Sequence, residues 1–372
     1  MSNSKFSILS TFTGGGGLDI GFHGDFTLFN NRFKALPFDT IIASDRNPYA
    51  CETIKNNPKY FSKTETICAD ITKYDFKTIE GSFDVLLGGF PCVTFSVVGK
   101  QQGITDDLNG KLYESFATYV EYFKPKVFLA ENVKGILSAN KGEAVKIIKQ
   151  RFEIDGYDLK VFLVNFADFG VPQLRQRVLF IGIRKDIKTP FIPPEYTRFN
   201  NHLTVEEAFA DLPQSCPNHQ FLRSSKRTEQ MLSLIPAGGN FKALIGTEYE
   251  VKALMSNIYR RLKGSEPAYT VIASGGGGTW TYHHEDARAL TNRERARLQA
   301  FPDDFVFQGS STEIRRQIGN AVPPVGIHPF AERIACVLQG IIPSYDPTNC
   351  IQEIYIDSPV DPNKTPKQLL LL

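Results

Sequence analysis

The sequence has few cysteines, and none of them stand close together. The six occupy positions 51, 68, 92, 216, 336 and 350, and no two are closer than 14 residues. This spacing excludes CxxC metal and redox motifs. The first residues, MSNSKFSILS, hold neither the apolar region of a signal peptide nor a myristoylation glycine, and no apolar run reaches membrane-spanning length. We therefore expect a cytoplasmic protein whose cysteines are free thiols.

A strong charge bias is also missing. The formal net charge of +2 does not by itself indicate a nucleic-acid partner, although it allows a local basic face. Of the 372 residues, 42% are hydrophobic and 22% are charged, which is typical of a globular protein able to bury a large core. This length suits two domains better than one.

Short apolar runs recur through the first half of the chain. They are apolar at successive positions rather than at alternate ones, as in a parallel sheet that is covered on both faces. The runs occupy residues 6–12, 39–45, 65–70, 83–90, 126–132, 158–166 and 177–183, and a helical pattern covers residues 111–123. We predict an α/β fold with a Rossmann-like, doubly wound, mostly parallel sheet.

Glycines, acids and a thiol follow five of these runs. They are Gly14–Gly17, Asp45, Asp70, Pro91–Cys92 and Glu131–Asn132. In an open α/β sheet, ligands bind beyond the carboxyl ends of the strands. We therefore predict one site at this edge of the sheet.

The composition changes after about residue 186. Residues 187–288 contain many prolines and glycines and little periodicity, which predicts a second, smaller, loop-rich domain with basic patches at 223–227 and 259–264. Helices are expected at 290–301, where Thr291 and Glu294 form a capping box, and around 326–340. The tail from Pro343 is expected to be extended.

The segment TFTGGGGLDIGF at 11–22 predicts a cofactor loop. Asp19 stands where the dinucleotide motif GxGxxG requires its third glycine, and no GK[ST] is present. A nucleoside cofactor without phosphates fits better, and S-adenosyl-L-methionine is the common one. Asp45 would then bind the ribose and Asp70 the adenine amino group. A tight turn beside two solvated acids is the alternative interpretation.

Eight motifs occur in an order that resembles the C5-cytosine-specific DNA methyltransferases. They span nearly the whole chain: Phe12–Gly17, Asp45, Asp70–Ile71, Phe90–Cys92, Glu131–Val133, Gln173–Arg177, Arg288–Pro302 and Gln317–Pro323. Val93 and Arg46 depart from the family pattern, in which glutamine and an aromatic residue are usual. The resemblance implies a catalytic domain at 1–186 plus 316–342, a target-recognition domain and hinge at 187–315, and a tail at 343–372. It is closest in organisation to bacterial type II restriction–modification methylases, which implies a monomer acting on double-stranded DNA and a cognate endonuclease.

The resemblance also implies roles for single residues. Cys92 would add to carbon 6 of a cytosine flipped out of the duplex, which activates carbon 5 for methylation. Glu131 would hold a proton at N3, and Asn132 would fix the loop. Arg177 would lie near the cytosine O2, and Arg175 near the nucleophile or a phosphate. The implied cofactor contacts are Phe12, Gly14, Gly16, Gly17, Leu18, Asp45, Arg46, Asp70, Ile71, Pro91, Leu112, Asn320 and Val322. The implied DNA contacts are Ser96, Gln173, Thr270, Gly275 and Gly276.

Other interpretations remain open at this point. A tRNA cytosine-5 methyltransferase would share the scaffold, but its usual Cys-Phe-Thr signature is absent. A catalytically silent nucleic-acid-binding protein would not need the intact motifs. For Cys92 alone the alternative is a buried thiol, and for Arg175 and Arg177 it is a surface ion pair. His283–His284 lack partner ligands at suitable spacing, so no metal site is predicted.

Overall fold

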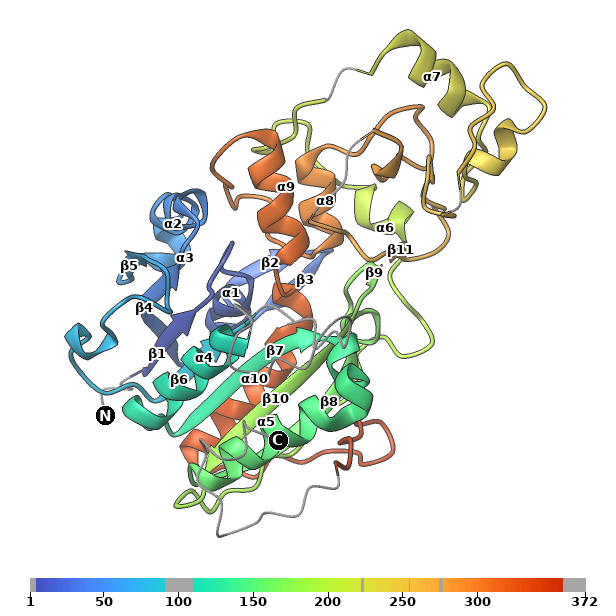
Figure 1. Ribbon diagram of the computed structural model, residues 1–372. Coiled ribbons are helices and arrows are strands. Elements are labelled where there is room, and N and C mark those ends of the chain that lie inside the picture. Colours follow the sequence, from blue (N-terminus) through green and yellow to red (C-terminus); the bar gives the residue numbers. More distant parts are fainter. Residues whose placement is uncertain (1–4, 91–109, 222–223, 254, 274–276, 357–372) are drawn as a thin grey trace.

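The computed structural model describes residues 5–90, 110–221, 224–253, 255–273 and 277–356. Its main feature is a seven-stranded sheet in the order β5-β4-β1-β6-β7-β10-β8 (Figure 1). The strands are β1 (Phe6–Thr11), β4 (Phe38–Asp45), β5 (Glu65–Cys68), β6 (Val85–Gly88), β7 (Val127–Val133), β8 (Tyr157–Asn165) and β10 (Gln176–Arg184). Each corresponds to one of the seven apolar runs. Only β10 runs antiparallel to its neighbours, β7 and β8, so the predicted mostly parallel, Rossmann-like sheet is confirmed.

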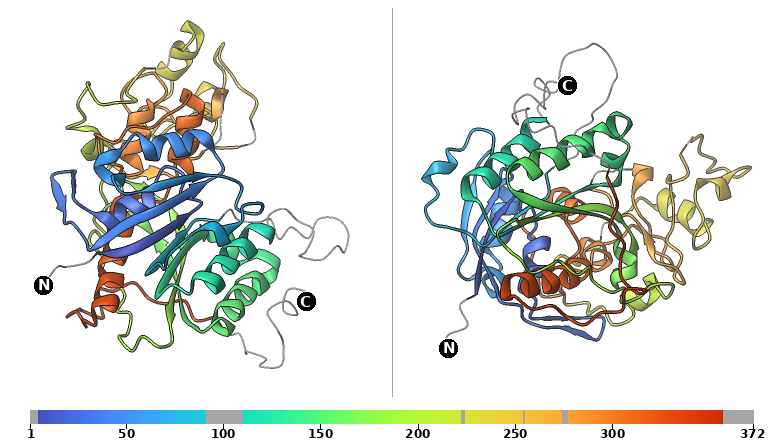
Figure 2. Two further views of the ribbon diagram at one scale, coloured as in Figure 1. Left: turned by 90° about the vertical axis from the view of Figure 1, so that its left-hand side faces the viewer. Right: turned by 90° about the horizontal axis from the view of Figure 1, so that it is seen from below.

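Helices cover both faces of this sheet. On one face lie α1 (Gly17–His23), α2 (Pro48–Lys55), α3 (Pro58–Phe61) and α10 (Pro324–Gln339), and on the other lie α4 (Gly110–Phe123) and α5 (Glu143–Ile154) (Figure 2). Neighbouring strand residues point to opposite faces. Ile8 therefore belongs to the core beneath α1 and α10, and Leu9 to the core beneath α4. Two buried faces explain why the strands are apolar at successive positions.

The C-terminal part of the chain returns to the sheet. Helix α8 (Asn292–Leu298) lies beside α9 (Ser311–Asn320), and α10 then packs against α1 (Figure 1). The predicted capping box of α8 is confirmed: the Thr291 hydroxyl accepts from the Glu294 amide, and the Glu294 carboxylate accepts from the Thr291 amide. Helix α9 was not predicted, because its sequence, STEIRRQIGN, is short and largely polar.

A loop-rich region lies to one side of the sheet and has a core of its own. It contains α6 (Val205–Phe209), α7 (Lys226–Ser233), and a core of Met231, Leu232, Ile235, Leu244, Tyr282 and Ala289 (Figure 1). The pair β9 (Gln173–Leu174) and β11 (Ala268–Tyr269) connects this region to the sheet. Arg261 of the predicted basic patch is buried here and donates to carbonyls of Leu232, Ile235, His283, His284 and Glu285. Its guanidinium therefore organises this region rather than facing phosphates.

The remaining elements are short. Strands β2 (Phe26–Leu28) and β3 (Asn31–Phe33) form a hairpin that was not predicted. Single 3₁₀ turns are η1 (Phe76–Thr78), η2 (Lys134–Leu137), η3 (Ala139–Gly142), η4 (Phe166–Phe169), η5 (Phe241–Leu244) and η6 (Gly277–Thr279). The tail, predicted to be extended, makes a turn at 347–349, and the Ile354 amide then donates to Val161 O of edge strand β8. This contact covers an edge that would otherwise be open to other chains. None of the helices in the described ranges is long and apolar enough to cross a membrane.

Candidate active site

A cavity of about 720 Å³ lies beyond the carboxyl ends of the parallel strands. Its wall is formed by the ends of β1, β4 and β7, by the segments after β5 and β6, and by the α9–α10 connection. It collects the following residues predicted for the site: Phe12, Gly14, Gly17, Leu18, Asp45, Arg46, Asp70, Ile71, Leu112, Glu131, Asn132, Arg175, Arg177, Asn320 and Val322. Residues far apart in the sequence therefore face one space, as expected for ligand binding at this edge.

The glycine loop brings α1 close to the α9–α10 connection. A Cβ at Gly17 would lie 2.1 Å from the Val322 carbonyl oxygen, so no larger residue fits there without displacing that backbone. Gly16 has a φ of 75° and does not line the cavity. A Cβ at Gly16 would instead contact Phe61 and Ile54. The structure thus gives Gly16, predicted as a cofactor contact, the role of a tight turn against the interior.

Two acids lie along one side of the cavity. The Asp45 carboxylate accepts from the Gly14 amide and from the Asn47 amide, both at 2.8 Å, and so holds the glycine loop against the start of α2. Burial raises the pKa of Asp45. The Asp70 carboxylate accepts from the amide and hydroxyl of Thr72, which lower its pKa and keep it ionised.

Glu131 and Arg177 form a buried ion pair at the other side of the cavity. Arg177 Nε lies 2.8 Å from Glu131 Oε1, and both side chains are largely enclosed. Neighbouring strands bring them together, because Arg177 of β10 pairs with Val133, two residues after Glu131 on β7. Burial raises the pKa of Glu131, although Arg177 and Arg175 oppose this shift. The carboxyl group is therefore easier to protonate than an exposed glutamate while keeping a fixed orientation.

Asn132 connects the end of β7 to the chain that precedes the predicted nucleophile. Its Nδ2 donates to the Phe90 carbonyl at 3.1 Å, and its Oδ1 accepts from the Val133 amide at 2.8 Å. A Cβ at Gly89 would lie 3.4 Å from Glu131 Oε2, so the end of β6 passes beside the glutamate. The next residues, Pro91 and Cys92, lie outside the described residues, as do Ser96, Gly275 and Gly276.

Arg175 and Gln173, predicted to lie near the nucleophile or a phosphate and to contact DNA, are both buried. Arg175 is 1% exposed and donates to the carbonyls of Val271, Gly319 and Ala321, and burial lowers its pKa to about 9. Gln173, predicted to contact DNA, has no exposed surface. Its amide donates to Leu298 O, and its Oε1 accepts from the Val271 amide. Gln173 ties β9 to α8 and to Val271, and Arg175 ties the following residue to the α9–α10 connection. Gln173 therefore cannot reach DNA without losing these bonds.

Other positions complete the wall, and most of them were not predicted. Thr270, predicted to contact DNA, is not one of them; it is half-buried and donates its hydroxyl to Leu174 O. The further lining residues are Thr13, Ser44, Asn47, Pro48, Ala50, Ala69, Gly89, Phe90, Val133, Arg316, Gln317, Gly319 and Ala321. Those that follow strands could have been predicted from position next to a strand end, whereas Arg316, Gln317, Gly319 and Ala321 belong to α9 and the residue that ends it.

Comparison with known proteins identifies the family. The model of the C-5 cytosine-specific DNA methylase family matches residues 6–336. This chain belongs to the C-5 cytosine-specific DNA methylase family. It is 44% identical to the type II methyltransferase M.NgoFVII of Neisseria gonorrhoeae, covering 90% of this chain and 87% of that protein. It is 40% identical to the type II methyltransferase M.BbvI of Brevibacillus brevis, covering 89% of this chain and 91% of that one.

Solved structures share the fold of this C-5 cytosine-specific DNA methylase. One protein, described as a DNA modification methyltransferase encoded within a prophage (E. coli), aligns with a TM-score of 0.67 at 22% identity, covering 90% of this chain and all of that chain. The Dnmt2 methyltransferase of S. pombe aligns with a TM-score of 0.56 at 17% identity, covering 90% and 99%. The predicted family and the DNA cytosine-5-methyltransferase activity are confirmed, and with them a methyl donor and a DNA substrate.

Proposed function

We propose that the cavity binds S-adenosyl-L-methionine beside a flipped cytosine, and that Cys92 and Glu131 activate that cytosine for methylation at carbon 5. The observation that carries the proposal is the continuity of one cavity from the glycine loop to the Glu131–Arg177 pair. Methyl transfer requires that donor and acceptor meet in one water-poor space. The assignment of Cys92 as the nucleophile also rests on the motif order. Cys92 comes two residues after Phe90, whose carbonyl accepts a hydrogen bond from Asn132.

The residues of the cavity fit this donor. Apolar side chains of Phe12, Leu18 and Ile71 suit a purine ring, while Asp45 and Asp70 supply acceptors for ribose hydroxyls and the adenine amino group. Asp45 retains acceptor capacity because two backbone amides use only part of its carboxylate. The bound donor supplies an electrophilic methyl group on a positively charged sulfur.

The protein's own groups prepare the cytosine. The Cys92 thiolate forms a bond to carbon 6, and the electrons of the 5,6 double bond shift towards carbon 5, which takes up the methyl group. Glu131, with its raised pKa, holds a proton at N3 so that negative charge does not accumulate on the ring. Arg177 fixes the orientation of this carboxyl group. Removal of the carbon 5 proton by a base restores the double bond and expels the thiolate.

We also propose the domain division given by the motifs. Residues 1–186 plus 316–342 would form the catalytic domain, 187–315 the target-recognition domain and hinge, and 343–372 the tail. The separate core around Leu232 and Tyr282 supports an independent recognition region, and the β9–β11 pair supports a hinge between the two parts.

Covalent trapping tests the mechanism. Duplex DNA containing 5-fluorocytosine cannot lose its carbon 5 substituent as a proton, so the wild-type enzyme should form a stable adduct with it when the donor is present. Cys92→Ser should form none, and Glu131→Gln should form it far more slowly. An adduct in Cys92→Ser, or an adduct on tRNA but not on DNA, would overturn the proposal. Calorimetric titration with S-adenosyl-L-homocysteine tests the cofactor assignment separately.

The biological role follows from the type II relatives. We propose that the enzyme acts as a monomer and protects host DNA against a cognate endonuclease. Bisulfite sequencing of DNA from cells that express the chain would give the methylated site. Methylation scattered without a common sequence would contradict a restriction–modification role.

A further inference from the structure

We propose that Arg295 and Arg315, together with Trp280, form a binding site for a phosphate group of the substrate DNA backbone. The inference rests on the DNA methylase assignment but concerns residues outside the proposed catalytic machinery. Nothing in the reaction chemistry requires these three side chains, and the motif interpretation gave them no role.

The arginines of α8 and α9 differ sharply in their surroundings. Arg293 is fully buried and donates to the carbonyls of Pro217, Pro302 and Phe305. Arg297 is also buried and pairs with the carboxylates of Asp211 and Asp303. These guanidinium groups are satisfied as buried charges normally are.

Arg295 and Arg315 lack such partners. Arg295 is 2% exposed, and its Nε and Nη2 have no hydrogen-bond partner among the described residues. Arg315 is 7% exposed, and its Nε is likewise enclosed and unpaired within the described part of the chain. The nearby acid Glu294 is already held by Arg288 at 2.7 Å. Burial and the neighbouring Arg315 lower the pKa of Arg295 to about 10.

Both guanidinium groups lie over the indole ring of Trp280. The guanidinium carbon of Arg315 lies 4.4 Å from its centroid, and that of Arg295 lies 5.9 Å away. An aromatic face attracts cations, but it does not satisfy their N–H donors. Two positive charges that repel each other are stabilised by an anion. The nitrogens open to it are Arg295 Nη1 and the two terminal nitrogens of Arg315, which are not among the enclosed, unpaired atoms.

The location of this site points to DNA as the source of the anion. Arg316, the residue after Arg315, lines the active-site cavity. One turn later, a Cβ at Gly319 would lie 2.2 Å from the Ala273 amide nitrogen, so Ile272 and Ala273 lie directly against α9. The site thus lies where the recognition region meets the cavity wall, and a duplex that delivers a cytosine to the cavity must pass nearby. The planar donor groups of two arginines suit the oxygens of one phosphate.

The salt dependence of DNA binding tests the inference. Fluorescence anisotropy would follow binding of a labelled mixed-sequence duplex to wild-type enzyme, Arg295→Met, Arg315→Met and the double variant over a series of NaCl concentrations. Loss of one phosphate contact should weaken binding about ten- to hundredfold at low salt and reduce the slope of log K against log salt by about 0.9. The double variant should lose no more slope than either single variant, because the two arginines share one phosphate.

Arg293→Met is the matched control, since it removes an equally buried but fully hydrogen-bonded arginine from the same helix. It should lower the melting temperature and leave the salt slope unchanged. Arg295→Met should keep or raise the melting temperature of the free enzyme, because it removes an unpaired buried charge. An unchanged slope in folded Arg295→Met and Arg315→Met, or melting temperatures lowered as in the control, would overturn the inference and leave the pair a structural support for Trp280.

Two readouts separate this inference from the proposed mechanism. Covalent trapping on 5-fluorocytosine DNA at saturating DNA, and titration with S-adenosyl-L-homocysteine, should match wild type in all three arginine variants. If the phosphate site is wrong, the trapping result still stands. If the mechanism is wrong, wild-type enzyme forms no adduct whatever the salt slopes show.

Discussion

The buried carboxyl group of Asp19 should make the stability of this enzyme depend on pH in a defined way. Asp19 lies on α1, just after the glycine loop, and has no exposed surface. Its oxygens accept from the hydroxyls of Ser10 at 3.0 Å and Thr40 at 2.8 Å. Burial raises the pKa of Asp19 from 3.8 to about 6, and these two hydrogen bonds oppose the shift only in part.

The magnitude follows from the size of this shift. Between about pH 4 and 6 the folded protein retains a proton that the unfolded chain has lost, so the free energy of unfolding falls as the pH rises. Two pKa units correspond to about 3 kcal/mol, at roughly 1.4 kcal/mol per unit. Asp19→Asn removes this term. The free energy of unfolding of the variant, minus that of wild type, should be about 3 kcal/mol larger at pH 8 than at pH 4.

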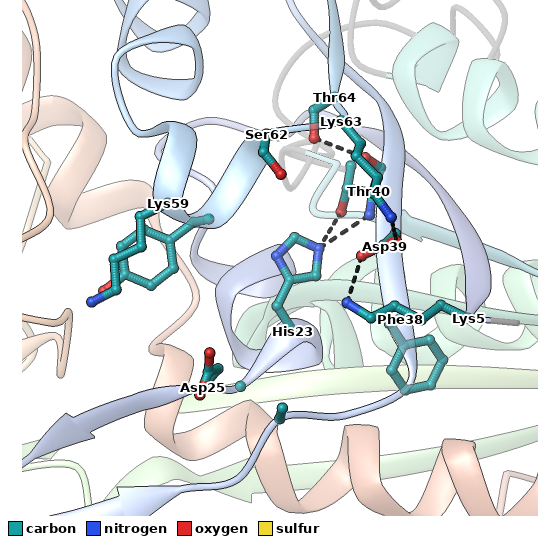
Figure 3. Close-up of a pocket in the computed structure, with 13 residues that line it drawn as sticks. Lys5, His23, Asp25, Phe38, Asp39, Thr40, Lys59, Ser62, Lys63 and Thr64 are labelled. Atoms are coloured by element: carbon teal, nitrogen blue, oxygen red, sulfur yellow. Dashed lines mark hydrogen bonds and ion pairs between the residues drawn. The ribbon is translucent and has the colours of Figure 1, made fainter. Parts of the chain in front are cut away.

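A neighbouring group has the opposite effect and makes the comparison between variants necessary. His23 Nε2 accepts from the Thr40 amide, as Figure 3 shows, and burial lowers the pKa of His23 to about 4. The unfolded chain therefore binds a proton below about pH 6.5 that the folded protein does not, and stability falls as the pH falls. In wild type the contributions of Asp19 and His23 to the pH dependence of the free energy of unfolding nearly cancel between pH 4 and 6. In Asp19→Asn only the contribution of His23 remains.

Urea denaturation followed by circular dichroism from pH 4 to 8 would measure the difference. Replacing the carboxylate by an amide also changes the free energy of unfolding by an amount that does not depend on pH. The decisive quantity is therefore how the difference between the variant and wild type changes with pH. Asp25→Asn, which alters an exposed aspartate, should stay within about 0.5 kcal/mol of wild type throughout. A difference between Asp19→Asn and wild type that does not change with pH would refute the reasoning.

Three further predictions concern the site and its supports. Glu131→Gln should slow methyl transfer by a factor of roughly 10² to 10⁴. The wild-type rate should fall as the pH rises through the raised pKa of Glu131, and the rate of the variant should not show this fall. Arg261→Met should destabilise the enzyme by about 3–5 kcal/mol, because it leaves several buried carbonyls unpaired. Thr291→Ala should cost about 1 kcal/mol through loss of the α8 cap.

Each of these predictions has its own measurement. Tritiated methyl transfer across pH tests Glu131→Gln against the exposed Glu143→Gln, and identical pH profiles would contradict the proton-holding role. Urea denaturation tests Arg261→Met against Arg260→Met, whose guanidinium stacks on the Tyr269 ring; equal losses in the two variants would contradict the assigned hydrogen bonds. For Thr291→Ala, an unchanged unfolding midpoint would mean that the cap is not used.

The sequence by itself determined much of the architecture. The apolar runs predicted the seven strands of the sheet, since the central strands are buried on both faces and are therefore apolar at successive positions. The α8 cap could be predicted because both of its hydrogen bonds join residues three apart. The edge on which the site lies followed from the residues that end the strands, because parallel strands end on one side.

The tertiary structure alone decided which polar groups meet. Arg175 and Arg295 are both buried arginines. Arg175 donates to three carbonyls, whereas Nε and Nη2 of Arg295 have no hydrogen-bond partner among the described residues. Gln173 belongs to a motif predicted to contact DNA, yet it bonds to Leu298, 125 residues away. Local sequence sets backbone preference and periodicity, but the partners of a buried side chain come from distant segments. Their positions are fixed only when the whole chain has packed.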